Sequence, residues 1–201
     1  MNVYLYNAST SFPKPKAVCD SIYNFLANIG GNSGRSNHTN ALESNRYVFD
    51  TRENIASFFN FPKIENVIFT NNITSSLNIL INGILKKGDH VITSSIEHNS
   101  VIRPLWNLKE SNIIDLDITE ANSLGIINVE SIKALIKPNT KLIILTHASN
   151  VIGSIQPIKE IGELCKKNNI FFILDSAQSA GVLPVDFAEF NLSALAFTGH
   201  K

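Results

Sequence analysis

The sequence is poor in charge and has no long apolar run. Charged residues make up 17% of the 201 residues, and 17 basic side chains balance 17 acidic ones. Because proteins that bind nucleic acids or membrane surfaces use an excess of Lys and Arg, zero net charge argues against both classes. No apolar run reaches the roughly 18 residues of a membrane span, and the N-terminus lacks the basic and apolar regions of a signal peptide. We expect a cytoplasmic protein that binds neither nucleic acid nor a membrane.

Cysteine is also scarce. Cys19 and Cys165 lie far apart, with neither the spacing of a metal site nor the number needed for a disulfide framework. This usage fits a reducing compartment. We expect both thiols to be structural and no metal to be bound.

The apolar residues, 44% of the chain, are enough for a sizeable core, and the length fits about one domain of roughly 150 residues or one domain with an additional part. Helical spacing predicts helices over residues 14–29, 41–59, 73–85, 98–109, 128–136 and 158–167. Short apolar runs predict strands over 66–70, 91–94, 113–117, 142–147, 170–175 and 194–197. Because these strands are apolar throughout and helices separate most of them, we expect an α/β fold: a mainly parallel sheet in a three-layer αβα arrangement.

Polar side chains follow five of these strands, where ligands of such sheets bind. They include Thr74, His98, Asn150, Asp175 with Gln178, and the run Thr198-Gly199-His200-Lys201. Taken singly, several have a structural explanation: Thr74 as a helix cap, Asn150 as a turn residue and Lys201 as a solvated terminal side chain. Together they predict a polar pocket on one rim of the sheet.

One ligand would use the whole set. An anion would bind the helix start at residues 73–75, and a flat ring would stack on His98. A protonated ring nitrogen would pair with Asp175, whose buried carboxylate needs a partner. An aldehyde would form a Schiff base with Lys201. Phosphate, pyridinium and aldehyde together describe pyridoxal 5'-phosphate.

The motifs EHNS, THASN, DSAQ and TGHK occur in this order, with further similarity in NASTSFPKP and in the segment from NVIFTNNITSS to NSVIRPL. From Val3 to Lys201 the chain resembles the class V aminotransferases, in particular cysteine desulfurases and selenocysteine lyases. The resemblance implies the large domain of fold type I pyridoxal phosphate enzymes, usually as a homodimer. It also implies cysteine or selenocysteine as the small-molecule substrate, and a sulfur-acceptor protein as partner in iron–sulfur cluster assembly.

The resemblance assigns roles to individual residues. It implies that Lys201 forms the Schiff base and moves the α-proton, and that His98 stacks on the ring. Phosphate contacts would come from Ile73, Thr74, Thr198 and His200. Asp175 would pair with the ring nitrogen, Gln178 with the ring hydroxyl, and Asn150 would lie beside ring and substrate. The substrate side would be lined by Ala8, Ser9 and Arg35.

Members of the family are longer than this chain. Their C-terminal half carries the arginine that holds the substrate carboxylate and the loop with the nucleophilic cysteine. We therefore expect an N-terminal segment (1–40) and a truncated large domain (41–201), with the C-terminal small domain absent. In fold type I the strand after the lysine lies between the first strand of the large domain and the strand leading to the lysine, so we expect an unpaired sheet edge here.

Several alternatives stay open. Another class V reaction (an aminotransferase, an epimerase or a kynureninase-like enzyme) would use the same cofactor site. A non-catalytic remnant would keep the fold alone. A nucleotide-binding α/β domain is disfavoured, since no G-x-G-x-x-G follows a strand and there is no Walker A loop.

Overall fold

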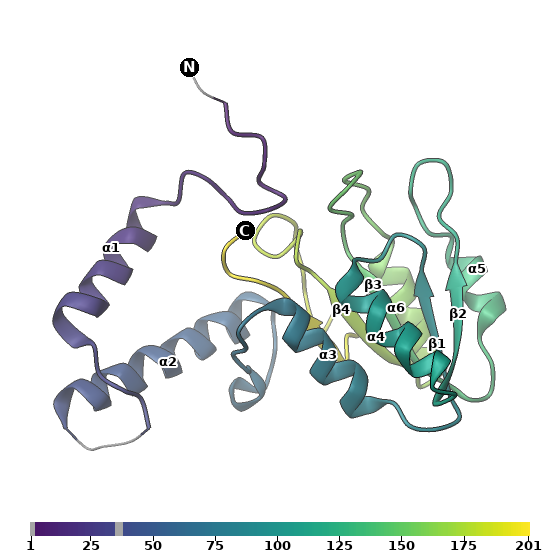
Figure 1. Cartoon of the computed structure of the whole chain (residues 1–201), viewed down its shortest axis with the longest axis horizontal. Coiled ribbons are helices and arrows are strands. Elements are labelled where there is room, and N and C mark those ends of the chain that lie inside the picture. The colour runs from purple at the N-terminus through teal and green to yellow at the C-terminus, as the bar shows by residue number, and fades with distance from the viewer. Residues whose placement is uncertain (1–2, 35–37) are drawn as a thin grey trace. The chain divides into compact units, whose positions relative to one another are not determined.

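The computed structural model describes residues 3–34 and 38–201. These fall into two compact units (Figure 1). The first contains the residues up to Ile68 together with His200, and the second contains Phe69–Gly199 with Lys201. The separation into an N-terminal segment (1–40) and a large domain (41–201) is a different division and stays a prediction.

The first unit is helical. It contains α1 (Lys16–Asn24), the π-helical turn η1 (Phe25–Ile29), α2 (Thr39–Phe58) and the 3-10 turn η2 (Ile64–Asn66). Both helices predicted here are confirmed.

The first helical stretch ends where the sequence predicts. Gly30 follows η1 with a left-handed φ of 51°, which glycine adopts without steric cost. The apolar stripe of α1 and η1 is exposed, however: Val18, Ile22 and Leu26 are 43%, 57% and 72% accessible. Helical periodicity therefore predicted the helix correctly, but the described part of the first unit does not bury its apolar face.

The strand predicted over 66–70 is wrong. Its first residue belongs to η2, and residues 67–70 have no strand assignment. Val67 has an extended conformation, yet an extended segment becomes a strand only when a neighbour completes its hydrogen bonds. The segment pairs with no described strand. Ile68 and Phe69 are 68% and 49% exposed, so the apolar run that suggested a buried strand lies open.

The second unit is built on a five-stranded sheet in the order β2-β1-β3-β4-β5. The strands are β1 (Asp89–Ser94), β2 (Ile114–Thr119), β3 (Thr140–Thr146), β4 (Phe171–Asp175) and β5 (Ala194–Ala196). Every neighbouring pair is parallel, so the five remaining strand predictions and the parallel arrangement are confirmed. The short β5 forms one outer edge of the sheet.

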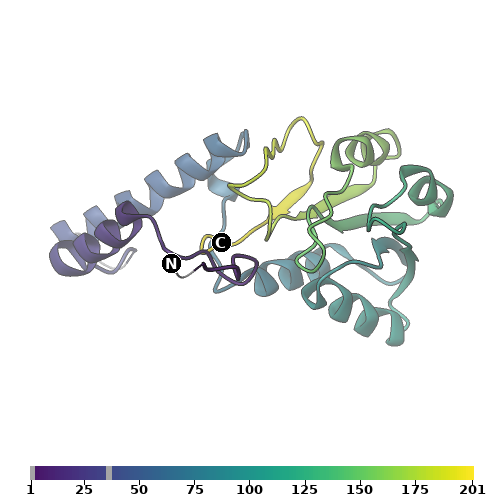
Figure 2. The ribbon, with the colours of Figure 1, turned by 90° about the horizontal axis from the view of Figure 1, so that it is seen from above.

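Four helices cover the two faces of this sheet, which confirms the three-layer αβα architecture (Figure 2). They are α3 (Ile73–Ile84), α4 (Asn99–Glu110), α5 (Val129–Leu135) and α6 (Ile158–Lys167). On one face, α3 and α4 pack together, and Leu77 and Leu105 join Val91 and Ile144 of the sheet in one buried cluster. On the other face, α5 packs on β2 and α6 on β4. Among the described residues no helix combines the length and apolar character needed to cross a bilayer.

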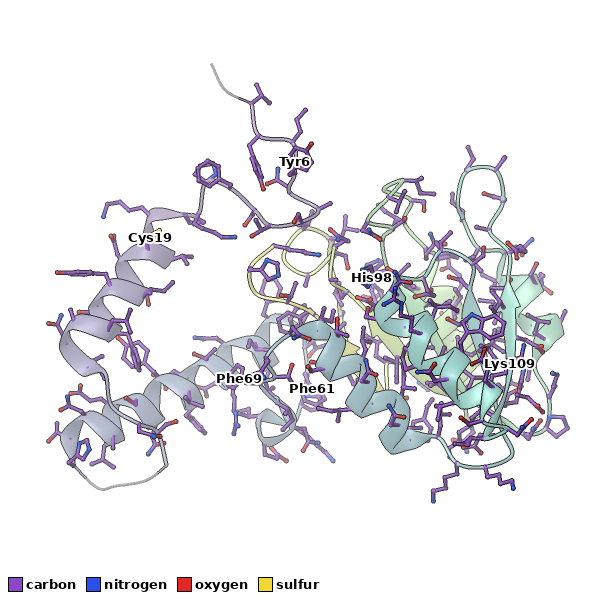
Figure 3. All side chains as sticks on the ribbon, viewed as in Figure 1. Tyr6, Cys19, Phe61, Phe69, His98 and Lys109 are labelled. Carbon is purple, nitrogen blue, oxygen red and sulfur yellow. The ribbon has the colours of Figure 1, made fainter. Side chains whose placement is uncertain are left out.

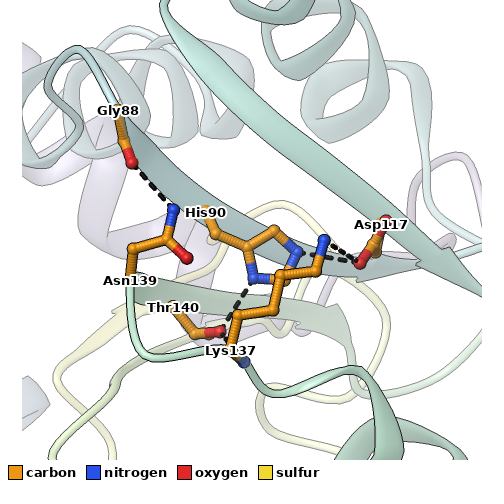
Figure 4. A network of polar contacts seen from close by, with 6 residues as sticks. All are labelled: Gly88, His90, Asp117, Lys137, Asn139 and Thr140. Atoms are coloured by element: carbon orange, nitrogen blue, oxygen red, sulfur yellow. Dashed lines mark hydrogen bonds and ion pairs between the residues drawn. The ribbon is translucent and has the colours of Figure 1, made fainter.

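A polar network occupies the amino ends of β1 and β3 (Figure 4). The fully buried His90 contacts Thr140 Oγ1 through Nδ1 at 2.8 Å and Asp117 Oδ2 through Nε2 at 3.0 Å. Lys137 Nζ lies 2.7 Å from the same Asp117 oxygen. Because the Asp117 carboxylate can only accept, His90 carries a proton on Nε2. The pKa of His90 is lowered by burial, so the ring is neutral and its Nδ1 accepts from the Thr140 hydroxyl. The same hydroxyl accepts from the Lys137 N–H at 2.7 Å.

Candidate functional site

The strand register fixes the rim on which the predicted residues lie. Because the strands are parallel, their carboxyl ends share one edge of the sheet. Within it, Thr146 of β3 is paired with Asp175 of β4, and Asp175 with Ala196 of β5. The segments that follow β1, β3 and β5 carry His98, Asn150 and Thr198. The topology thus brings the strand-end residues of the second unit to one rim, as the sequence predicts.

Asp175 is the buried charge of this rim. It is 2% exposed, and its Oδ1 accepts a hydrogen bond from the Ala177 N–H at 3.0 Å. Burial raises the pKa of Asp175, whereas the Ala177 hydrogen bond and electrostatic interactions with His98 and Lys201 oppose that rise. The carboxylate therefore lies in the field of two groups that the sequence assigned to the same ligand.

His98 is the N-cap of α4 (Figure 3), and hydrogen bonds to Ser100 fix its orientation. Its Nδ1 accepts a hydrogen bond from the Ser100 N–H at 3.1 Å and lies 2.8 Å from Ser100 Oγ. An Nδ1 that accepts from a backbone N–H carries no proton, so the proton of the neutral ring is on Nε2. The residue is exposed, and the cap leaves the ring accessible to a ligand.

The start of α3 has the features of an anion site. Asn72 caps this helix, accepting from the Ser75 N–H through its side chain at 2.8 Å. The N–H groups of Ile73 and Thr74 precede the first intrahelical hydrogen bonds and point out of the helix start. Since Asn72 is the cap, the alternative explanation of Thr74 as a helix cap is wrong, and its exposed hydroxyl stands in the first turn.

The other rim residues differ in burial. Asn150 is exposed in a turn after β3, next to Ser149, whose Oγ accepts from the Val151 N–H at 3.3 Å. Gln178, Thr198 and Lys201 are half-buried.

Four predicted residues are not part of the second unit's rim. Ala8, Ser9 and His200 belong to the first unit, and Arg35 lies outside the described residues. Within the first unit, the His200 carbonyl accepts from the Ser11 N–H at 3.2 Å. The roles predicted for these four stay predictions.

Sequence reasoning missed Glu97, which stands between β1 and His98. Its Oε1 accepts from Ser94 Oγ at 2.5 Å and from the Thr146 N–H at 3.0 Å. Its Oε2 is buried without a hydrogen-bond partner among the described residues. Burial raises the pKa of Glu97 to about 8, although the two hydrogen bonds oppose the rise, and the negative charge of Asp175 adds to it. The residue appears in the EHNS motif, but nothing in the pattern shows that its carboxyl is buried.

The two cysteines differ from each other. Cys165 is fully buried on α6, and burial raises the pKa of its thiol to about 12, as expected for a structural residue. Cys19 is exposed on α1 (Figure 3). Unlike Cys165, it is therefore not part of a buried core.

Comparison with known proteins places this geometry in context. The family model of class-V aminotransferases matches residues 3–201. A probable cysteine desulfurase of Borreliella burgdorferi is 34% identical over 204 residues, covering 99% of this chain and 48% of the relative. One of Methanothermobacter thermautotrophicus is 32% identical, covering 100% and 50%. The chain spans about half the length of the curated relatives it matches.

Two solved structures resemble this chain in fold and in sequence. The apo cysteine desulfurase from Thermococcus onnurineus superposes with a TM-score of 0.90 at 30% identity, covering 97% of this chain and 49% of that one. The structure of SspA in complex with cysteine gives a TM-score of 0.91 at 29% identity, covering 100% and 57%.

Proposed function

The chain belongs to the class V aminotransferase family, and we propose that it carries the cofactor-binding part of a pyridoxal 5'-phosphate-dependent cysteine desulfurase. The family is one of pyridoxal phosphate enzymes, and the named relatives are cysteine desulfurases. The single observation that carries the proposal is the buried carboxylate of Asp175, held in the field of His98 and Lys201.

The residues present fit the chemistry of this cofactor. The buried Asp175 carboxylate, which interacts electrostatically with His98 and Lys201, suits a ring nitrogen that must stay protonated. The N–H groups at the start of α3, with the Thr74 hydroxyl, suit a phosphate. The accessible ring of His98, oriented by Ser100, suits a flat heteroaromatic partner. When bound, pyridoxal phosphate supplies an electron sink for the carbanion formed at the substrate α-carbon.

Each of the chain's own groups would then have its own role. The Lys201 amine would bind the aldehyde covalently and would take the substrate α-proton. The Asp175 carboxylate would hold the proton on the ring nitrogen, and His98 would stack on the ring. Ile73, Thr74, Thr198 and His200 would bind phosphate, and Gln178 would orient the ring hydroxyl.

The proposed substrate is L-cysteine. Relatives named cysteine desulfurases and the solved complex of SspA with cysteine support this choice. The products are L-alanine and a sulfur atom transferred to a protein thiol as a persulfide. Asn150, Ala8, Ser9 and Arg35 are the proposed substrate-side residues. A homodimer, a cytoplasmic location and a sulfur-acceptor protein belong to the same proposal.

Cofactor binding tests the proposal. Titrating the chain with pyridoxal phosphate should produce a near-visible absorption band that borohydride abolishes. Lys201→Ala should lose the band, whereas the matched control Lys166→Ala, an exposed lysine of α6, should keep it. A band that persists in Lys201→Ala would refute the assignment of Lys201. If the complete enzyme binds the cofactor but forms no alanine from cysteine, that result would favour another class V reaction.

A further inference from the structure

The carboxyl of Glu97 is buried, and the proposed function assigns it no role. It is the residue before His98 and lies in the loop between β1 and α4. Its Oε1 crosses from this loop to the end of β3, accepting from the Thr146 N–H at 3.0 Å. The same oxygen accepts from Ser94 Oγ, in the last residue of β1, at 2.5 Å. One carboxyl oxygen thus joins the ends of two neighbouring strands.

These contacts link the two residues that would hold the cofactor ring. Thr146, which donates to Glu97, is the strand partner of Asp175, and the next N–H, of His147, donates to the Asp175 carbonyl at 2.9 Å. On the other side of Glu97, the peptide bond leads directly into His98. The path from His98 to Asp175 therefore runs through one side-chain hydrogen bond and the end of the β3–β4 ladder.

We propose that Glu97 is a positioning residue, whose hydrogen bond to Thr146 fixes the loop carrying His98 at the correct place over Asp175. The proposal rests on the proposed function, since the ring that His98 and Asp175 would hold is that of pyridoxal phosphate. Glu97 is not assigned a contact with cofactor or substrate. It acts through the two residues that have one.

The protonation state of Glu97 matters for this role. Its Oε2 is buried and has no partner among the described residues, so a negative charge there would cost more free energy than a neutral acid. The pKa is accordingly raised to about 8. The charged group from another element whose field reaches Glu97 is Asp175 of β4, and His98 adjoins it on its own loop. A neutral Glu97 adds no second negative charge beside Asp175.

The test compares two variants of the full chain with the wild type. Glu97→Gln keeps an oxygen for the Thr146 N–H and cannot ionise, whereas Glu97→Ala removes the hydrogen bond. Glu110→Gln, an exposed acid at the end of α4, is the control. Two quantities are measured: the amide hydrogen exchange of Thr146 without cofactor, and the dissociation constant of pyridoxal phosphate at pH 7 and pH 9.

We expect Glu97→Ala to accelerate exchange at Thr146 and to weaken cofactor binding, each by about tenfold. Glu97→Gln should match the wild type at pH 7 and bind more tightly than the wild type at pH 9, where the wild-type carboxyl ionises. The control should match the wild type throughout. Wild-type exchange and affinity in Glu97→Ala would overturn the proposal, as would Glu97→Gln behaving like Glu97→Ala.

Two other results, a variant that does not fold and a wild-type chain that binds no cofactor, can be told apart from a failure of the proposal. If Glu97→Ala does not fold, Glu97→Met replaces it, because methionine fills similar space but offers no oxygen to the Thr146 N–H. A loss of affinity in this variant then supports the proposal, and wild-type affinity overturns it. If the wild-type chain binds no cofactor, the proposed function has failed, and the exchange rate at Thr146 alone decides whether Glu97 holds the loop.

Discussion

His90 Nε2 donates a hydrogen bond of 3.0 Å to Asp117 Oδ2 across the β1–β2 pair, while Lys137 reaches the same oxygen. Burial and the charge of Lys137 lower the pKa of His90, although Asp117 opposes them. His90 is therefore neutral in the folded protein at neutral pH.

This arrangement predicts how stability depends on pH. In the unfolded chain His90 takes up a proton below about pH 6.5, while in the folded chain it resists protonation. Its contribution to stability is thus complete above pH 6.5 and is lost as the pH falls toward the lowered folded pKa. The buried His147, whose pKa burial also lowers, acts with the same sign.

We expect the free energy of unfolding to fall between pH 6.5 and 5, with His90 contributing at most about 1.4 kcal/mol per pH unit. Urea unfolding at several pH values measures the slope. His90→Gln should reduce the slope by the His90 share, and a slope unchanged in this variant would contradict the account.

The close packing of Gly162 in α6 predicts how alanine substitutions at two helical glycines change stability. A Cβ at Gly162 would lie 1.9 Å from the carbonyl oxygen of Phe190, a main-chain atom that cannot rotate away. Gly162→Ala should therefore lower the free energy of unfolding by about 1–3 kcal/mol. Gly83→Ala is the matched control, since the helical Gly83 has open space around it, and it should raise stability by about 0.5–1 kcal/mol. Equal effects of the two substitutions on the thermal midpoint would contradict the packing.

Thiol labelling tests the contrast between the two cysteines. The exposed Cys19 should react with a maleimide in the native chain, whereas the buried Cys165, with a pKa raised to about 12, should react only after unfolding. Cys19→Ser should abolish native labelling. Rapid native labelling of the Cys19→Ser variant would show that Cys165 is accessible.

We expect replacement of the Asp175 carboxyl to stabilise the folded chain but to weaken cofactor binding. Because burial raises the pKa of this carboxyl, its ionisation at pH 7 costs free energy in the folded state. Asp175→Asn should raise the free energy of unfolding by roughly 1 kcal/mol while weakening pyridoxal phosphate binding by at least about tenfold. Calorimetric unfolding and cofactor titration of one preparation measure both, and tighter binding by the variant would contradict the role of Asp175.

The sequence predicted those features that depend on local pattern. Apolar runs such as 142–147 and 170–175 predicted β3 and β4, and because parallel strands share a carboxyl rim, Asp175 and His98 could be placed on it. The strand at 66–70 failed because pairing depends on a neighbour rather than on its own residues. Glu97 was missed because a glutamate beside a histidine carries no sign of burial, and the contact with Thr146 joins residues 49 positions apart.

The lysine to which pyridoxal phosphate attaches is the most direct test of the proposed cofactor site. The full chain is incubated with pyridoxal phosphate, reduced with borohydride and digested, and the peptides are mapped by mass spectrometry. We expect one predominant pyridoxyl group, on Lys201, whose yield falls sharply in Asp175→Asn. A pyridoxyl group distributed over the exposed lysines, with Lys201 no more modified than Lys166, would contradict it.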